Sequence, residues 1–261
     1  MPDPDRFEVV LVSPRNPLNI GAAARAMANF GLARLTVVAP FEPHWREAKS
    51  AVGAGELLEG ARKTTSLREA LADCTLVLGT GTRTYRRPEQ PAVLLADLGP
   101  HVERALLRGG RIGLVFGPEK HGLTRDDLAL CHLLVEIPTH PRQPSMNLGQ
   151  AVAVCLYELL ARSQGKPQDA APQPTESGPG AATLPGASPA AASTLPAAMH
   201  DLDRLAEVIA ATMETVNLSP AAMRKANRHD LDLLLRRLAL TRGDVRRTMG
   251  LFRRILRQLG A

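Results

Sequence analysis

The stretch SPRNPLNIGAAARAMANFG, residues 13–31, lies between two short apolar runs, FEVVLV at 7–12 and RLTVV at 34–38. Both runs are rich in Val and Leu and show no regular polar alternation, which is typical of strands buried on both faces of a parallel sheet. The alanine-rich residues between them predict a helix near 20–30. The order strand, helix, strand at the start of the chain indicates an α/β fold.

The same alternation continues to about residue 162. Apolar runs predict three further strands, at 74–79, 111–116 and 132–137. The remaining segments predict helices near 66–72, 91–107, 125–130 and 147–162. Together these elements describe a doubly wound α/β domain with a parallel sheet, in which ligands bind beyond the carboxyl ends of the strands.

The composition changes after this domain. Residues 164–197 contain seven prolines, nine alanines and almost no large apolar side chain, so they cannot bury enough surface to offset the entropy of ordering. We therefore expect a disordered linker there, between an α/β domain at 1–163 and a helical extension at 198–261. Leucines and arginines at helical spacing predict three helices in the extension, near 199–216, 220–239 and 243–259.

The net charge of +6 is concentrated in this extension, which has 12 basic and 7 acidic residues. From Arg236 to Arg257, eight arginines stand against one acidic residue, Asp244. This asymmetry favours a polyanionic partner, with nucleic acid as the first candidate; a solvated helix face is the simpler alternative. The arginines that we expect to contact such a partner, and RNA if the partner is a nucleic acid, are Arg236, Arg237, Arg246, Arg247, Arg253 and Arg254.

Several classes of protein are disfavoured. The N-terminus has no basic segment followed by an apolar run, and no stretch reaches the roughly 18 apolar residues of a membrane span. Cys74, Cys131 and Cys155 lie far apart in apolar surroundings and have no metal-ligand spacing. The usual glycine-rich nucleotide-binding motifs are missing. We expect a cytoplasmic protein with buried thiols, without a metal and without a standard nicotinamide or ATP site.

Three residues of the opening stretch are candidates for a function. Asn19 is expected to cap the helix, and Arg25 lies one turn beyond Gly21 on the same helix face. Because Gly21 has no Cβ, it would leave room beneath Arg25 for a ligand or for another chain. Alternatively, Gly21 permits close packing of the helix and Arg25 is an ordinary surface arginine.

The loops after the later strands hold further candidates. The sequence GTGTR at 79–83 is small enough to let a cofactor approach the backbone. The loop FGPEKHGL at 116–123 contains Glu119, and IPTHPRQPSMN at 137–147 contains three prolines together with Ser145 and Asn147. Each loop also has a purely structural explanation, as a turn or as the cap of the next helix.

Together, three motifs resemble those of the SPOUT superfamily of RNA methyltransferases, specifically its TrmH-like ribose 2′-O-methyltransferases. The motif N-x-G-x-x-x-R is Asn19, Gly21 and Arg25, followed by Phe30-Gly31. The other two motifs are G-x-E-x-x-G-L, formed by Gly117, Glu119, Gly122 and Leu123, and S-x-N-x-x-x-A-V, formed by Ser145, Asn147, Ala151 and Val152. The resemblance covers residues 7–162 and rests on the order and spacing of all three motifs.

This resemblance implies a deep trefoil knot, a homodimer and S-adenosylmethionine as the cofactor. By position, the cofactor contacts would be Thr80, Gly81, Thr82, Gly117, Ile137, Pro144, Ser145 and Met146. Arg25 of one subunit would face the cofactor of the other, which would explain the space at Gly21. The implied reaction is methylation of a ribose 2′-hydroxyl of tRNA. The opening motif and the helical extension look most like the enzymes that act on nucleotide 32 of the anticodon loop.

The implied catalytic residues are Arg25, Asn19, Glu119, Ser145 and Asn147. The resemblance implies that Arg25 acts as the general base. Removing a proton from a guanidinium near pH 7 costs about 7 kcal/mol, so we expect Arg25 instead to stay charged, to stabilise the developing alkoxide and to bind the adjacent phosphate. The other four residues would orient Arg25 and the ribose. The linker would let the C-terminal helices clamp distant parts of the tRNA or lie over the partner subunit.

Three other functions stay open at this point. The same chemistry could act on rRNA or on another tRNA position. The chain could also be a non-catalytic RNA-binding protein of the same fold, or an α/β enzyme of small-molecule metabolism with an unrelated cofactor. Binding of S-adenosylmethionine would separate the catalytic from the non-catalytic protein, and salt-dependent tRNA binding would separate both from the metabolic enzyme.

Overall fold

The computed structural model describes residues 3–82, 89–162 and 193–260. Within them, one seven-stranded sheet has the order β3-β2-β1-β6-β4-β7-β5, and every strand pair is parallel. The strands are β1 (Phe7–Val12), β2 (Leu35–Val38), β3 (Arg62–Thr64), β4 (Leu76–Thr80), β5 (Ala92–Leu94), β6 (Ile112–Phe116) and β7 (Leu133–Glu136). The predicted parallel α/β fold is therefore confirmed.

Helices connect the strands and complete the chain. The helices between strands are α1 (Pro17–Asn29), α2 (Gly55–Gly60), α3 (Leu67–Ala70), α4 (Gly99–Leu107) and α5 (Arg125–Leu128). After β7 come α6 (Leu148–Leu156) and a π-helical turn, η4 (Tyr157–Ala161). The C-terminal helices are α8 (Met199–Thr215), α9 (Arg224–Arg237) and α10 (Arg242–Gln258), and short 3-10 turns are η1 (Pro4–Arg6), η2 (Trp45–Glu47), η3 (Leu95–Asp97) and η6 (Ala221–Met223).

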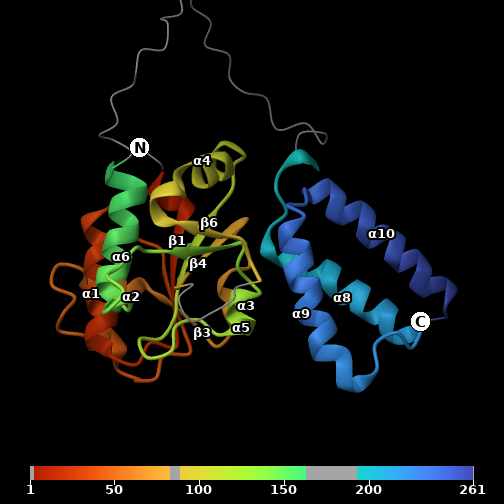
Figure 1. Ribbon diagram of the computed structural model, residues 1–261, viewed down its shortest axis with the longest axis horizontal. Helices are drawn as coiled ribbons and strands as arrows, with labels where there is room; N and C mark the ends of the chain where they lie inside the picture. The colour runs from red at the N-terminus through yellow and green to blue at the C-terminus, as the bar shows by residue number, and fades with distance from the viewer. Residues whose placement is uncertain (1–2, 83–88, 163–192, 261) are drawn as a thin grey trace, which may run out of the picture.

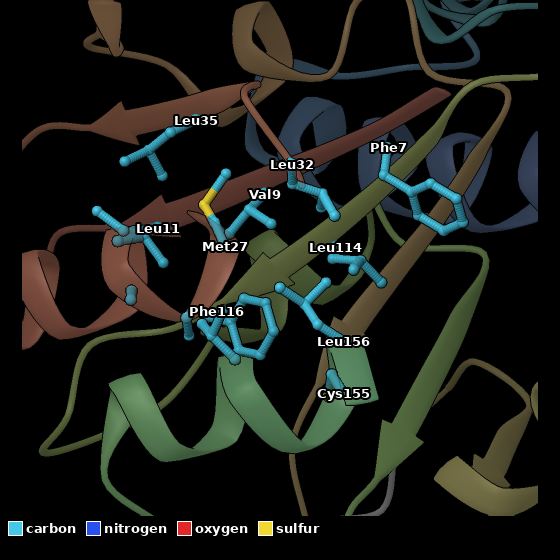
Figure 2. Packing of buried hydrophobic residues seen from close by; sticks show 14 of the residues in the cluster. Phe7, Val9, Leu11, Met27, Leu32, Leu35, Leu114, Phe116, Cys155 and Leu156 are labelled. Atoms are coloured by element: carbon cyan, nitrogen blue, oxygen red, sulfur yellow. The ribbon is translucent and has the colours of Figure 1, made fainter. Parts of the chain in front are cut away.

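The two faces of the sheet have separate hydrophobic cores. Along β1, Phe7, Val9 and Leu11 belong to the core on one face, while Val10 and Val12 belong to the core on the other, as the period of two in a strand requires. Figure 2 shows the first core, where side chains of β1, β2 and β6 meet those of α1 and α6. In Figure 1, α1, α2 and α6 lie on one side of the sheet and the C-terminal helices lie beyond the other.

Two short strands were not expected from the sequence. Residues 62–64 form β3, whose Arg62 and Lys63 are exposed, and the helix predicted over 91–107 divides into β5, η3 and α4. Both strands lie at the edges of the sheet, where charged residues and short length are usual and an apolar run is not needed. The helical pattern near 91–107 is wrong for its first eight residues because Gly99 and Pro100 begin α4.

The start of α1 also differs from the prediction. Asn16, not Asn19, is the N-cap, since its side chain accepts a hydrogen bond from the backbone N–H of Leu18 at 2.9 Å. Pro17 occupies the first helical position, where its missing N–H costs nothing. Asn19 therefore lies within the first turn of α1, and its side chain is free to make other contacts.

The C-terminal helices pack against the α/β domain of their own chain. The backbone N–H groups of Met199 and His200 donate to the carbonyls of Cys74 and Ala72 at 2.9 and 3.0 Å, and Met199 and Leu202 are buried in the second core. The structure thus docks these helices on their own α/β domain, whereas the sequence suggested that the linker lets them clamp distant parts of the tRNA or lie over the partner subunit. Residues 193–197, assigned to the linker, are ordered; the rest of that prediction, 164–192, lies outside the described residues.

A buried ionic cluster joins the two parts of the chain. Arg68 of α3 forms ion pairs with Asp203 of α8 and Asp232 of α9. Arg236 of α9 lies between the same two carboxylates, 3.3 Å from Asp203 and 3.2 Å from Asp232, and only 4% of Arg236 is exposed. Arg228 completes the cluster at 3.2 Å from Asp232. Since a buried charge needs a partner, these residues fix the position of α8 and α9 on α3.

The buried-thiol prediction is confirmed for Cys74, Cys131 and Cys155, which are free and buried. Burial raises the pKa of each thiol to about 12, so the thiols are unreactive at neutral pH. No helix in the described part of the chain is both long and apolar enough to cross a membrane. The described residues also contain no group of three or more His, Cys, Asp or Glu residues arranged to hold a metal ion.

Candidate functional site

Three of the predicted site residues meet in one hydrogen-bonded series at the carboxyl edge of the sheet. The side-chain amide of Asn147 donates to Oδ1 of Asn19 at 2.8 Å, and the amide of Asn19 donates to Oε1 of Glu119 at 2.8 Å. These residues come from the loop after β7, from α1 and from the loop after β6. We call this series the Asn147–Asn19–Glu119 network.

Backbone donors complete the environment of Glu119. The N–H groups of Arg15 and Asn16 donate to its two carboxylate oxygens at 3.2 and 3.3 Å. Burial raises the pKa of Glu119, but the hydrogen bonds from Asn19 and from the backbone outweigh burial and hold the pKa below its usual range. Glu119 is therefore an ionised acceptor at neutral pH and fixes which way the amide of Asn19 points.

Close packing of α6 on α1 brings Asn147 to Asn19. Asn147 is the N-cap of α6 and accepts from the backbone N–H groups of Gly149 and Gln150 at 2.9 and 3.4 Å. A Cβ at Gly149 would lie 2.6 Å from Cβ of Ala22 on α1, which is closer than two carbons can pack. The glycine thus allows the two helices to approach and sets the position of the network.

Arg25 lies apart from this network. It is exposed on α1, and it makes no hydrogen bond or ion pair with any residue that the structure describes. Ser145 is also exposed and likewise has no hydrogen bond within the described ranges. The structure thus joins Asn19, Glu119 and Asn147, while Arg25 and Ser145 remain available at the surface.

Gly21 does not clear space beneath Arg25, as the resemblance had suggested. A Cβ at Gly21 would lie 2.3 Å from Oγ of Ser50 and 2.9 Å from the backbone nitrogen of Ala51. Ser50 in turn donates to the carbonyl of Leu18 at 2.6 Å. The alternative explanation therefore holds for Gly21: it lets the segment after η2 pack directly on the helix of the same chain.

The residues expected to hold a cofactor follow three adjacent strands, β6, β4 and β7. Thr80 at the end of β4 donates to the carbonyl of Val115 in β6 at 3.0 Å. The N–H of Gly81 donates to Val135 in β7 at 3.1 Å, and Thr82 donates to Glu136 at 3.3 Å. These contacts fix residues 80–82 between the neighbouring strand ends; Arg83, also predicted here, lies outside the described residues.

The loops after β6 and β7 close over the same edge. A Cβ at Gly117 would lie 2.3 Å from the backbone of Gly122 and Leu123, so only glycine lets this loop fold back on itself. In the loop after β7, Thr139 donates to the carbonyl of Pro144 at 3.1 Å. The structure therefore brings the predicted positions Gly117, Ile137, Pro144, Ser145 and Met146 to the edge that also carries residues 80–82.

One of the arginines predicted to contact RNA is not available. Arg236 is buried in the ionic cluster described above, so it cannot reach a nucleic acid without breaking that cluster. The signal was present in the sequence, because Asp232 lies four residues before Arg236 on the same helix face. The other predicted arginines are all exposed, on α9 and α10: Arg237, Arg246, Arg247, Arg253 and Arg254.

The site thus defines a class: an all-parallel α/β protein with a polar network and glycine-rich loops at the carboxyl edge of its sheet. Residues 6–157 match the SpoU rRNA Methylase family, and the chain belongs to this family. The part of the chain matched is the α/β domain, from η1 to the start of η4.

Two relatives and one solved structure extend this result. The chain is 42% identical over 167 residues to the tRNA (cytidine/uridine/adenosine-2′-O-)-methyltransferase TrmJ of Pseudomonas aeruginosa, over 62% of this chain and 65% of that protein. It is 38% identical over 162 residues to the tRNA (cytidine-2′-O-)-methyltransferase TrmJ of Methanocaldococcus jannaschii, over 60% of this chain and 68% of that protein. The match thus spans just under two thirds of the Pseudomonas protein.

The C-terminal helices are included in the structural comparison. The crystal structure of TrmJ from Z. mobilis ZM4 has a TM-score of 0.75 with this chain at 28% identity, covering 95% of this chain and 98% of that one. The similarity therefore extends beyond the α/β domain.

Proposed function

We propose that this protein transfers a methyl group from S-adenosylmethionine to a ribose 2′-hydroxyl of tRNA. The observation that carries the proposal is the Asn147–Asn19–Glu119 network, which joins one residue from each of the three motifs. A helix cap alone does not explain it, because Asn147 caps α6 with Oδ1 and uses its amide to bind Asn19. The names of the relatives, tRNA 2′-O-methyltransferases, supply the substrate class.

S-adenosylmethionine fits the residues at the ends of β4, β6 and β7. The glycines at 81 and 117 keep side chains away from the backbone there, and Ile137 and Met146 offer partly buried apolar surface. We propose that the cofactor is held by Thr80, Gly81, Thr82, Gly117, Ile137, Pro144, Ser145 and Met146. It would supply an electrophilic methyl group.

Arg25 is the residue that we assign to charge stabilisation. Its exposure and its lack of a partner among the described residues leave its N–H donors free to bind a phosphate and the oxygen that develops negative charge. Asn19 and Glu119 are held together and would orient the ribose, and Ser145 would assist them. The proton would pass to a phosphate oxygen or to water, because the guanidinium retains its own.

We further propose a homodimer in which Arg25 of one subunit acts beside the cofactor of the other. Large apolar side chains are exposed on and beside the packed pair of α1 and α6: Leu18, Val154 and Tyr157. A second subunit seated on these helices would bury them. The loops after β6 and β7, together with α6, would form the deep trefoil knot that the family resemblance implies.

The exposed arginines of α9 and α10 would bind the tRNA backbone. Such contacts add affinity and fix the register without choosing a sequence. We propose nucleotide 32 of the anticodon loop as the target, in agreement with the resemblance of the opening motif and the C-terminal helices.

Mapping of the methyl groups tests the proposal. Purified protein would be incubated with S-adenosylmethionine and unmodified tRNA, and 2′-O-methyl groups would be located by nuclease digestion and mass spectrometry. A new methyl group at nucleotide 32 is the expected result. Methylation elsewhere in tRNA, or in rRNA only, would refute the assigned nucleotide or the assigned RNA. Binding of S-adenosylmethionine without any methylation would indicate the non-catalytic alternative.

The role of Arg25 has its own test. We expect Arg25→Ala to lose most of the single-turnover rate, and Arg25→Lys to retain part of it, because an ammonium also stabilises an alkoxide. If the rate of Arg25→Lys instead rises with pH as the new amine loses its proton, the residue at position 25 acts as a base and charge stabilisation is refuted.

A further inference from the structure

An exposed aromatic ring lies beside the Asn147–Asn19–Glu119 network. Phe41 follows β2 and is 66% exposed. The guanidinium carbon of Arg15 lies 5.3 Å from the centroid of its ring, within the range of a cation–π contact. Arg15 is itself exposed, so the pair is open to solvent. We call it the Arg15–Phe41 platform.

The backbone holds the platform in place. The N–H of Phe41 donates to the carbonyl of Pro14 at 3.2 Å, which ties the loop after β2 to the loop after β1. Ser13 and Ala39, at the ends of these strands, have positive φ angles of 45° and 43°. Positive φ is uncommon for residues other than glycine, so this arrangement is kept at some conformational cost.

The order of the strands places the platform on one side of the network. Along the carboxyl edge, β2 with Phe41 comes first, then β1 with Arg15, then β6 with Glu119, and then β4 and β7 with the proposed cofactor residues. The backbone N–H of Arg15 binds Glu119 directly. A ribose at the network therefore has the cofactor residues on one side and the platform on the other.

We propose that the Arg15–Phe41 platform binds a nucleobase of the substrate RNA immediately next to the methylated ribose. The base would stack on the open face of Phe41, and Arg15 would hold the ring from its other face and attract the adjacent phosphate. Stacking on an aromatic ring needs an unpaired base and tolerates any base identity, which suits a loop nucleotide. This inference rests on the proposed function, since it requires an RNA substrate.

The test compares Phe41→Ala with the wild-type protein, using an anticodon stem-loop RNA that carries 2-aminopurine next to the mapped methylation site. Wild-type protein should quench the 2-aminopurine fluorescence on binding, as stacking does. We expect Phe41→Ala to lose this quenching and to weaken RNA binding by about 5- to 150-fold, the range for stacking of one base on an aromatic side chain. Affinity for S-adenosylmethionine should be unchanged. Phe41→Trp should restore both the quenching and the affinity.

Two further variants make the test specific. Leu107→Ala removes a large apolar side chain that is also exposed, at the end of α4, and should leave RNA binding unaltered. Arg15→Ala keeps the backbone N–H that binds Glu119 and should weaken RNA binding less than Phe41→Ala does.

The two proposals can fail separately. If the wild-type protein methylates RNA but Phe41→Ala binds it equally well, or Phe41→Leu replaces the ring fully, the stacking inference is refuted and the proposed function stands. If the wild-type protein neither binds nor methylates RNA, the proposed function itself fails.

Discussion

Replacing Asn19 by aspartate tests whether the Asn147–Asn19–Glu119 network acts as one unit. The substitution changes a donor amide into a carboxylate of the same shape, 2.8 Å from Oε1 of Glu119. Two unit charges at that distance repel by about 6 kcal/mol at an effective dielectric constant of ~20. Because Glu119 is exposed, screening reduces this repulsion to about 1 kcal/mol. The variant also loses a hydrogen bond to a charged acceptor, typically ~1.5–3 kcal/mol.

We therefore expect kcat/KM of Asn19→Asp to fall by about 100-fold or more at pH 8, since each 1.4 kcal/mol is tenfold. The repulsion raises the pKa of one carboxyl of the new pair, so a proton bound between them restores the missing donor. The deficit relative to wild type should then shrink as the pH falls from 8 towards 5.5, by at most tenfold per pH unit for one proton. Methyl transfer from radiolabelled S-adenosylmethionine to tRNA measures both rates.

The matched control is Asn217→Asp, the same substitution at an exposed residue just after α8. It should leave the rate close to wild type at every pH. A deficit of Asn19→Asp that stays constant across this pH range would show that geometry, not charge, matters at position 19. A deficit below about threefold at pH 8 would refute a functional network.

Four further predictions concern stability and RNA affinity. Arg236→Met removes one cationic partner of Asp203 and Asp232. It should lower the free energy of unfolding, measured in urea, by about 3 kcal/mol. The control is Arg237→Ala at an exposed position, which should change the free energy of unfolding by less than ~0.5 kcal/mol. Burial and the nearby Arg236 guanidinium lower the pKa of His132 to about 3. The unfolded chain therefore binds a proton at His132 more readily than the folded protein does. The contribution of His132 to the free energy of unfolding is complete above pH ~6.5 and is lost as the pH falls towards 3. In His132→Asn, the new side chain can still accept from the N–H of Val77. The free energy of unfolding of this variant should fall less steeply with decreasing pH than that of wild type, by up to about 1.4 kcal/mol per pH unit in that window. Gly149→Ala should lower the free energy of unfolding by about 1–3 kcal/mol through its contact with Ala22, and it should also slow methyl transfer. Gly250 has open space around it, so Gly250→Ala should raise the free energy of unfolding by up to ~1 kcal/mol. Arg253→Ala and Arg254→Ala should each reduce the slope of log K for tRNA binding against log salt concentration by about 1. An unchanged slope would show that α10 does not contact the RNA.

The parts of the structure that the sequence predicted follow from local periodicity. The buried strands were predicted correctly because Val and Leu on both faces of β1, β2 and β6 leave little alternative. The placement of Glu119 and Asn147 at one edge of the sheet could also be predicted, since both follow strands whose carboxyl ends share that edge. What periodicity could not provide was the role of each asparagine. Asn16 and Asn19 are both natural caps, and only Pro17 at the first helical position favours Asn16.

The errors share a cause in contacts between distant segments. Gly21 was interpreted from its neighbour Arg25, but the atoms that forbid a Cβ belong to Ser50 and Ala51, some thirty residues away. Arg236 was assigned to the RNA surface by its charge, but Asp203 on another helix holds it inside. No pattern within one helix reveals the contacts of Gly21. The i,i+4 spacing of Asp232 and Arg236 indicates an ion pair but not its burial, because Asp203 on another helix is brought to Arg236 by tertiary packing.

The buried position of Arg236 changes how the C-terminal arginines can act. A clamp on a flexible tether would add affinity through effective concentration alone, with no fixed distance to the reacting ribose. Here the ionic cluster around Arg68 and the second core, shared by Met199 and Leu202 with the sheet, hold α8 and α9 against α3. Because α10 packs against α8, its arginines also stand at a set distance from the carboxyl edge of their own subunit. If these arginines contact RNA as proposed, an RNA that binds both regions would have to match that distance. Contacts that add affinity without choosing a sequence would then also select substrates by shape.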